Sequence, residues 1–202
     1  PVLLSGAKVP PIGDEKWRDA DAWAIGDELL YRCGNDADAL LWRARAAMAI
    51  LGFLTCLLVF VWSRELFGVE GGLLSAAMAA FCPTMLGHGS LATSDMAAAF
   101  AFLLALRRLW IMFHSVTPFN VLACGAASGV LLLSKMSAPL IVPMAVVMLA
   151  LRLASGAPLE VRFAGWKYEA EDRLRRAAVL VAALAVHAVA AWTMLWAFYS
   201  FR

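Results

Sequence analysis

Long stretches without charged residues alternate with short basic segments along most of this chain. Residues 46–62 contain no charge over 17 positions and lie between Arg45 and Arg64. A bilayer core needs about 20 apolar residues in helical conformation, and about 17–25 is the usual range. The pattern therefore predicts a membrane span here, and five similar stretches follow it. The six predicted spans are 44–63, 69–86, 96–113, 118–134, 137–152 and 177–199.

Composition supports this interpretation. The chain has 202 residues, of which 63% are hydrophobic and 16% are charged. A soluble domain has about 25% charged and roughly 45–50% apolar residues, so the balance excludes that class as well as disordered, collagenous and disulfide-rich chains. We predict an all-α fold, a polytopic transmembrane helical bundle formed by residues 43–202.

The distribution of charge predicts the orientation. Nine lysines and arginines lie in the loops after the first, third and fifth predicted spans, including 153–176, or near the ends of these spans (Arg107, Arg108 and Arg152), whereas the other two loops contain only Lys135. The positive-inside rule places the first set in the cytoplasm. Lys135 and residues 1–42 then face outward. The basic residues lie in short loops between apolar runs, so they do not indicate nucleic acid binding.

Residues 1–42 form an acidic segment with eight acidic and four basic side chains. Its tryptophans, Trp17 and Trp23, among many acids predict either short helices at the outer interface or an ordered loop outside the membrane. The adjacent acids Asp14-Glu15 and Asp27-Glu28 resemble paired carboxylates for acid–base chemistry, but adjacent acids in a polar segment are usually only solvated.

The spacing of two glycines and the spacing of the cysteines both concern packing. Gly125 and Gly129 are spaced so that two helix backbones can approach closely, and we expect this contact inside the bundle rather than between two chains. The four cysteines have no CxxC or paired spacing, so neither a zinc site nor a disulfide framework is indicated. They are Cys33, Cys56, Cys82 and Cys124.

Ionisable residues at the predicted outer boundary are the candidates for chemistry, because charges there need a partner or water. In the segment HGSLATSD, Asp95 and His88 are candidates, although Asp95 could equally cap the helix that it begins. Lys135 must either extend to the outer face or meet an anion such as a lipid phosphate. Arg43 and Arg45 indicate an anionic partner or simple interfacial anchoring.

Other chemistry has less support. His187 lies deep in the last apolar stretch, where a hydrogen-bonded neutral imidazole is expected rather than a ligand. The chain has no HExxH, Walker loop, GxGxxG or nucleophile elbow, so zincin, P-loop, Rossmann and α/β-hydrolase interpretations have no support.

Several short features occur in an order and spacing found in one family. They are the arginine that opens the first span (Arg45), the turn from Arg64 to Gly68, Pro83, the segment HGxLxTxD from His88 to Asp95, and the run from Gly125 to Ala138. Together they resemble the protein O-mannosyltransferase-like glycosyltransferases (glycosyltransferase family 39), which have the GT-C fold. The resemblance covers about residues 45–140, and the closing WAFYSFR also fits.

The resemblance implies an activity. Such an enzyme moves a sugar, a hexose such as mannose, from a polyprenyl-phosphate carrier to a hydroxyl or amine of a protein, lipid or glycan acceptor. The site would lie on the outer face of a bacterial inner membrane, with room for a divalent metal. Asp95, His88, Lys135 and Arg45 would contact the lipid-linked sugar.

The catalytic base is expected elsewhere. In this family it lies in an acidic dipeptide after a first transmembrane helix, and no such helix precedes the acidic segment here. We therefore expect the sequence to be a fragment, with the base upstream of Pro1 and a further part beyond its end.

Two other classes remain open. A transporter module would line a solute or proton path with Asp95, Lys135 and His187, although two of these lie at the predicted boundary and no inverted repeat is visible. A non-catalytic assembly subunit of the same ancestry is the third interpretation.

Overall fold

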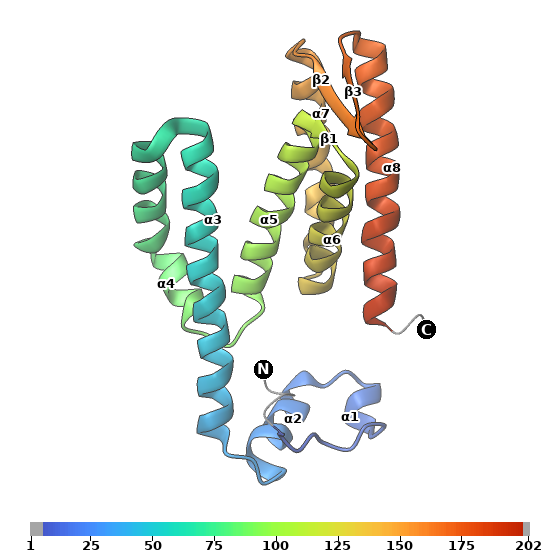
Figure 1. Ribbon diagram of the computed structural model, residues 1–202. Helices are drawn as coiled ribbons and strands as arrows, with labels where there is room; N and C mark the ends of the chain where they lie inside the picture. Colours follow the sequence, from blue (N-terminus) through green and yellow to red (C-terminus); the bar gives the residue numbers. More distant parts are fainter. Residues whose placement is uncertain (1–5, 200–202) are drawn as a thin grey trace.

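The computed structural model describes residues 6–199, most of which are helical (Figure 1). Short helical turns begin the chain, a series of longer helices follows, and a small sheet precedes the last helix. The elements are α1 (Glu15–Arg18), α2 (Ala22–Asp27), the π-helical turn η2 (Glu28–Arg32), α3 (Ala37–Ala80), α4 (Pro83–Gly89), α5 (Asp95–His114), β1 (Ser115–Val116), α6 (Pro118–Ser134), the 3-10 turn η3 (Ala138–Leu140), α7 (Ile141–Ala154), β2 (Leu159–Phe163), β3 (Trp166–Ala170) and α8 (Arg173–Phe198).

Helix α3 consists of two antiparallel limbs that meet at Gly68 (Figure 1). Gly68 has φ 79° and ψ −178°, a conformation that is open essentially to glycine alone. The limbs are in contact, since a Cβ added to Gly72 would stand 3.1 Å from the carbonyl oxygen of Phe60. One glycine thus converts a 44-residue helical stretch into a hairpin.

Three helices of the described residues are long and apolar enough to cross a membrane, namely α3, α5 and α8. Helices α6 and α7 are apolar but shorter, with 17 and 14 residues. The helical, membrane-type fold is therefore confirmed, whereas the count of six spans is not. Pro83 begins α4 as a separate helix, because proline is well tolerated at the first helical position but cannot continue the hydrogen-bond ladder.

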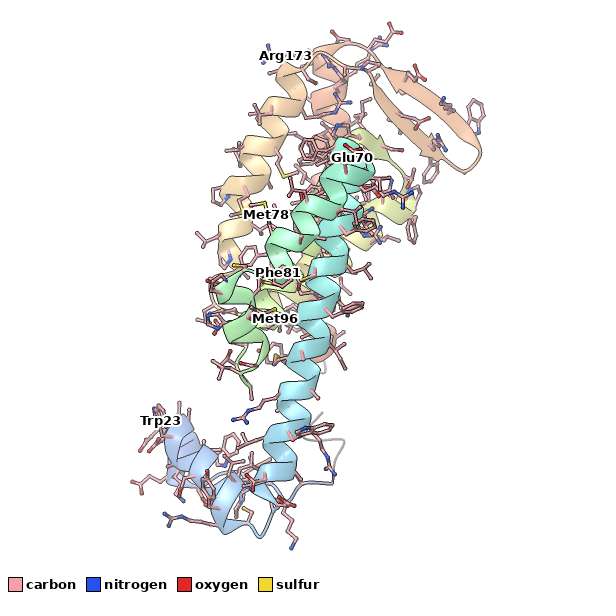
Figure 2. All side chains as sticks on the ribbon, turned by 90° about the vertical axis from the view of Figure 1, so that its left-hand side faces the viewer. Trp23, Glu70, Met78, Phe81, Met96 and Arg173 are labelled. Atoms are coloured by element: carbon pink, nitrogen blue, oxygen red, sulfur yellow. The ribbon has the colours of Figure 1, made fainter. Side chains whose placement is uncertain are left out.

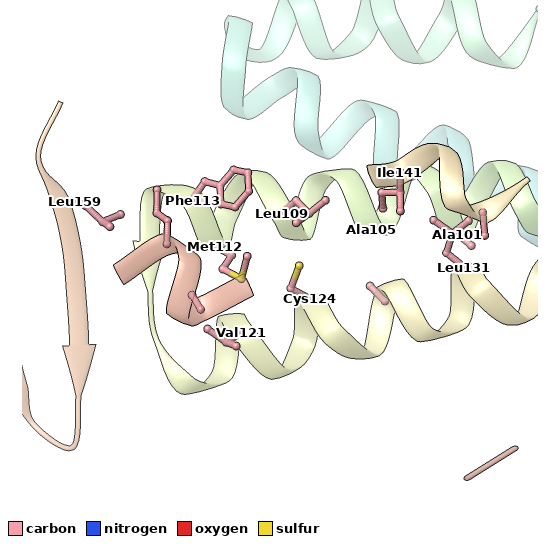
Figure 3. Close-up of a cluster of buried hydrophobic side chains, with 14 of the residues drawn as sticks. Ala101, Ala105, Leu109, Met112, Phe113, Val121, Cys124, Leu131, Ile141 and Leu159 are labelled. Atoms are coloured by element: carbon pink, nitrogen blue, oxygen red, sulfur yellow. The ribbon is translucent and has the colours of Figure 1, made fainter. Parts of the chain in front are cut away.

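The core lies around α5, between α6, α7 and the sheet (Figure 3). Leu109, Met112 and Phe113 of α5 are almost completely buried against Cys124 and Leu131 of α6. Burial of Cys124 agrees with its expected packing role, and all four cysteines are free thiols. Helix α5 is the most buried of the three long helices, which makes it the centre of the bundle.

The glycine pair of α6 packs inside the chain, as predicted. A Cβ on Gly125 would stand 2.5 Å from the Cβ of Ala190, and one on Gly129 would stand 2.8 Å from the Cβ of Met194. Both partners belong to α8, so α6 and α8 approach with almost no side chain between them.

The sheet in the loop 153–176 was not predicted. Strand β2 pairs in parallel with β1 and antiparallel with β3, and Phe163 lies opposite Trp166 at the hairpin tip. Arg152 and Arg176, which the sequence analysis counted as loop charges, are buried beneath this sheet. The guanidinium of Arg152 donates to the carbonyl oxygens of Phe113, Ala157 and Pro158, each at 2.8 Å, and so ties α5 and α7 to the hairpin.

Large apolar side chains cover the outside of the bundle. Met78 projects outward from the second limb of α3 and Phe81 directly after it (Figure 2), and Val189 and Trp192 do so from α8. A helix that exposes apolar side chains along most of its surface is typical of contact with lipid. The acidic segment lies apart from the bundle at one end, with Trp23 exposed (Figures 1 and 2).

Candidate functional site

Asp95, Lys135 and His88 form a cluster at one end of the bundle. The ammonium of Lys135 donates to one carboxylate oxygen of Asp95. The other carboxylate oxygen lies 3.3 Å from Nδ1 of His88, a buried nitrogen without a hydrogen-bond partner among the described residues. About a third of the Asp95 side chain and two fifths of the other two remain exposed, so the cluster can receive a ligand.

Three elements converge to build this cluster. Asp95 is the first residue of α5, Lys135 directly follows the last residue of α6, and His88 lies near the end of α4. Because α5 and α6 are antiparallel neighbours, the start of one meets the end of the other (Figure 1). The sequence analysis expected Lys135 either to extend to the outer face or to meet an anion. In the structure Lys135 pairs with an anion, the carboxylate of Asp95.

The two interpretations of Asp95 can now be compared. Ser94, not Asp95, occupies the N-cap position of α5, and its side chain makes no cap hydrogen bond. Asp95 lies in the first turn, where its charge complements the helix dipole. Its carboxylate oxygens face Lys135 and His88, so its contacts are those of a side-chain cluster rather than of a backbone cap.

Arg45 lies on the wall of a neighbouring groove of about 760 Å³ between α3 and α4. The walls are apolar apart from Arg45 and Ser90, and the α3 side presents one helix face. No ion pair joins Arg45 to the cluster within residues 6–199, so the structure places it beside the three other candidates and not among them. The lining residues are Trp42, Arg45, Ala46, Ala49, Gly52, Phe53, Cys56, Ala80, Met85, Leu86, Gly89 and Ser90.

Met96 connects the groove to the cluster. It follows Asp95, is 1% exposed, and lies between α3 and α4 (Figure 2). Its side chain stands 3.7 Å from the position of a Cβ on either Gly52 or Gly89, both of which line the groove. The residue next to Asp95 therefore lies against two residues that line the groove, which makes the groove and the charged cluster neighbours.

Sequence reasoning missed the groove itself. Trp42, Arg45, Ala49, Phe53 and Cys56 follow the spacing of three and four residues that keeps side chains on one helical face. That periodicity was visible in the sequence, but an apolar face in a predicted span does not reveal whether it meets lipid, protein or a groove.

The remaining candidates are engaged elsewhere. Glu28 pairs with Lys16 at 2.6 Å and Asp27 pairs with Arg32 at 2.7 Å, so these acids serve the short helices of the acidic segment. Asp14 occupies the N-cap position of α1, next to Glu15.

His187 is half-buried and hydrogen-bonded, as expected for a neutral imidazole in an apolar stretch. Its Nε2 lies 2.8 Å from the hydroxyl of Ser128, in the contact between α6 and α8. Ser128 precedes Lys135 by seven residues, about 10 Å along a helix, so His187 is separate from the Asp95 cluster. No group of three or more metal-ligating side chains occurs in the described range 6–199.

An apolar helical bundle of this kind, with three helices long and apolar enough to cross a membrane among the described residues, is typical of a membrane-embedded protein. Residues 37–160, more than half of the chain, match the family described as dolichyl-phosphate-mannose-protein mannosyltransferase. The chain belongs to this family, which is a family of membrane glycosyltransferases. No curated protein and no solved structure matches it.

Proposed function

We propose that this protein transfers a hexose, such as mannose, from a polyprenyl-phosphate carrier to an acceptor hydroxyl or amine at the outer face of the membrane. The observation that carries the proposal is the apolar groove with Arg45 at its wall, adjoining the Lys135–Asp95–His88 cluster. A polyprenyl-phosphate sugar has the matching parts, namely an apolar chain, a negative phosphate and a sugar rich in hydroxyl groups.

The groove accounts for the carrier lipid. From Trp42 to Cys56 its α3 wall covers 14 residue steps, about 21 Å of helix, with a single charged side chain near one end. Arg45 lies at the end close to the acidic segment, where the phosphate would lie while the chain runs toward the membrane interior. A guanidinium is suited to a phosphate because it presents several donors in a fixed plane.

Lys135 and Asp95 account for the reacting end of the donor. Lys135 has three N–H donors and Asp95 uses only part of this capacity, so the ammonium can also donate to the departing phosphate. The Asp95 carboxylate holds the ammonium in place and can accept hydrogen bonds from sugar hydroxyls.

In the transfer step the acceptor oxygen or nitrogen forms a bond to the anomeric carbon. The bond from that carbon to the phosphate oxygen breaks, and the phosphate keeps the electron pair. A carboxylate must accept the acceptor's proton. The three clustered residues are assigned to donor binding and not to this proton transfer.

The elements found at the two ends of the bundle support the proposed orientation in the membrane. The acidic segment, the Asp95 cluster and the end of α8 lie at one end of the bundle, and the sheet lies at the other (Figure 1). With six crossings, of which α6 and α7 are short ones, the end with the sheet lies in the cytoplasm and the cluster faces the periplasm of a bacterial inner membrane.

The test is donor-dependent transfer by the full-length protein in liposomes. Polyprenyl-phosphate radiolabelled mannose is supplied with acceptors of each class, namely protein, lipid and glycan. Lys135→Ala should lower the rate by about 10²–10³-fold, as for loss of a donor to a developing anion, and Asp95→Asn should also lower it strongly. Glu70→Gln and Lys167→Ala, exposed charges at the other end, should leave it unchanged.

Transfer that is equal in all four variants would refute the assigned roles. Absence of transfer with every acceptor, in protein shown to be folded, would refute the proposed activity.

A further inference from the structure

The β2–β3 hairpin is amphipathic along its whole length. Cross-strand partners in an antiparallel pair share one face. Here Leu159 pairs with Ala170, Val161 with Tyr168 and Phe163 with Trp166, which makes one face apolar and aromatic. The opposite face carries Glu160 and Glu169 together with Arg162 and Lys167.

Protein covers only the base of the apolar face. Leu159 and Ala170 are fully buried, Tyr168 is 45% exposed, and at the tip Phe163 is 67% and Trp166 82% exposed. Large aromatic side chains at a strand tip are costly to expose to water, so this gradient indicates that something outside the chain covers the tip.

The position of the hairpin along α8 indicates what covers its aromatic tip. Strand β2 and helix α8 line a common apolar groove of about 400 Å³, to which α8 contributes residues from Val179 to Val186. These residues follow Arg176, the last Lys or Arg of α8, and lie in its charge-free run. Figure 1 shows the strands lying beside the first turns of α8 rather than beyond its end. The aromatic tip is therefore at the depth of the membrane boundary.

The charges nearby favour an anionic surface. Arg173 and Arg175 are exposed in the first turn of α8, and the hydroxyl of Tyr168 accepts a hydrogen bond from Arg175. Tryptophan and tyrosine are enriched at the boundary between lipid headgroups and acyl chains, and basic residues there attract anionic lipid.

We propose that the β2–β3 hairpin is a membrane anchor, which inserts Phe163 and Trp166 into the lipid leaflet opposite the Asp95 cluster and places its basic neighbours against anionic headgroups. The hairpin thereby fixes the α6–α8 pair at a defined depth in the bilayer. This role is independent of the proposed transferase activity.

The test measures the depth of two neighbouring positions in the full-length protein. Trp166→Cys and Lys167→Cys, in a cysteine-free background, carry an environment-sensitive fluorophore in nanodiscs of phosphatidylcholine mixed with phosphatidylglycerol. The fluorophore at position 166 should be quenched by nitroxide-labelled lipid and shielded from aqueous iodide. The fluorophore at position 167, on the charged face, should be quenched by iodide and not by the labelled lipid.

Two results would overturn the proposal. Equal access of iodide to both positions would place the tip in water. Shielding of position 166 from iodide without quenching by the labelled lipid would mean that protein covers it.

A second measurement needs no cysteine replacement. Brominated lipid should quench part of the intrinsic tryptophan fluorescence of the wild type, and the quenched part should be smaller in Trp166→Tyr, where only the other exposed tryptophans, such as Trp192, still meet lipid. An equal quenched fraction in both proteins would also contradict the anchor.

Discussion

Replacing Gly125 by alanine should weaken the contact between α6 and α8. The added Cβ would stand 2.5 Å from the Cβ of Ala190, 3.0 Å from the carbonyl oxygen of His187 and 3.3 Å from the amide nitrogen of Ala191. Two of these three neighbours are backbone atoms, which cannot rotate away. The helices must therefore separate.

The size of the effect follows from these distances. Ordinary contacts of a Cβ lie at 3.4–4 Å, so the 2.5 Å contact requires a separation of about 1 Å. A gap of about 0.5–1 Å already forfeits a quarter to a half of the dispersion energy of each contact along the interface. Overpacking of this kind costs about 1–3 kcal/mol. The helix propensity of alanine over glycine returns up to about 1 kcal/mol, so we expect a net loss of about 1–2 kcal/mol.

The assay is unfolding of the detergent-solubilised protein by a denaturing detergent, followed by circular dichroism. Gly26→Ala is the matched control, because a Cβ there meets nothing within 4 Å, and it should be neutral or slightly stabilising. Ala190→Gly should recover part of the loss when combined with Gly125→Ala. A Gly125→Ala variant as stable as the control, or an Ala190→Gly change that recovers nothing, would show that close packing at Gly125 does not hold α6 and α8 together.

Three further predictions concern the end of the bundle that carries the sheet. Arg152→Ala should cost about 3 kcal/mol, because the buried carbonyl group of Phe113 and the partly buried ones of Ala157 and Pro158 lose a charged donor. Denaturant unfolding measures this, and a cost no larger than that of Arg173→Ala, an exposed residue, would contradict it. Gly68→Ala should destabilise the α3 hairpin by about 1–3 kcal/mol, seen as a lower Tm, since φ 79° with ψ −178° is strained for alanine; an unchanged Tm would refute this. Arg162 and Lys167 hold the pKa of Glu160 below its usual 4.5, so the ion pairs stabilise the hairpin fully above pH 4.5 and are lost as the pH falls through the lowered pKa. Hydrogen exchange of the hairpin amides, corrected for the intrinsic effect of pH, should show loss of protection on acidification, and constant protection would count against the pairs.

Much of the bundle could be predicted from the sequence because apolar helices leave a strong local signal. Residues 46–62 predicted the first limb of α3, and the spacing of Gly125 and Gly129 predicted a close helix contact inside the chain, which α8 makes in the structure. Both features depend on residues within a few helical turns of one another.

The Asp95–Lys135 pair could not be predicted in the same way. Orientation arguments placed both residues on one side, but they are 40 positions apart and meet only because α5 and α6 pack as antiparallel neighbours. The buried state of Arg152 and Arg176 depends likewise on the segment just before β2, because they donate to the carbonyl groups of Pro158 and Ala157.

The sequence of the hairpin contains an alternating apolar and polar pattern, but its strands are too short for this pattern to be distinctive. Leu159–Phe163 and Trp166–Ala170 both alternate apolar and polar residues, and the two residues between them, Ala164 and Gly165, have positive φ, as a tight hairpin turn requires. Five-residue strands inside a basic loop are easily taken for irregular structure when the surrounding chain is dominated by apolar helices.

In the proposed function, the groove and the cluster together hold a lipid-linked phosphate. The most direct measurement is binding of polyprenyl phosphate to the full-length protein by native mass spectrometry, with the phosphate-free polyprenol as the matched ligand. We predict that the phosphate binds at least about tenfold more tightly, as expected for charge-assisted hydrogen bonds of about 1.5–3 kcal/mol. Lys135→Ala and Arg45→Ala should each reduce this preference, whereas Lys167→Ala should not. Equal binding of the phosphate and the alcohol, or a preference untouched by both substitutions, would contradict the account.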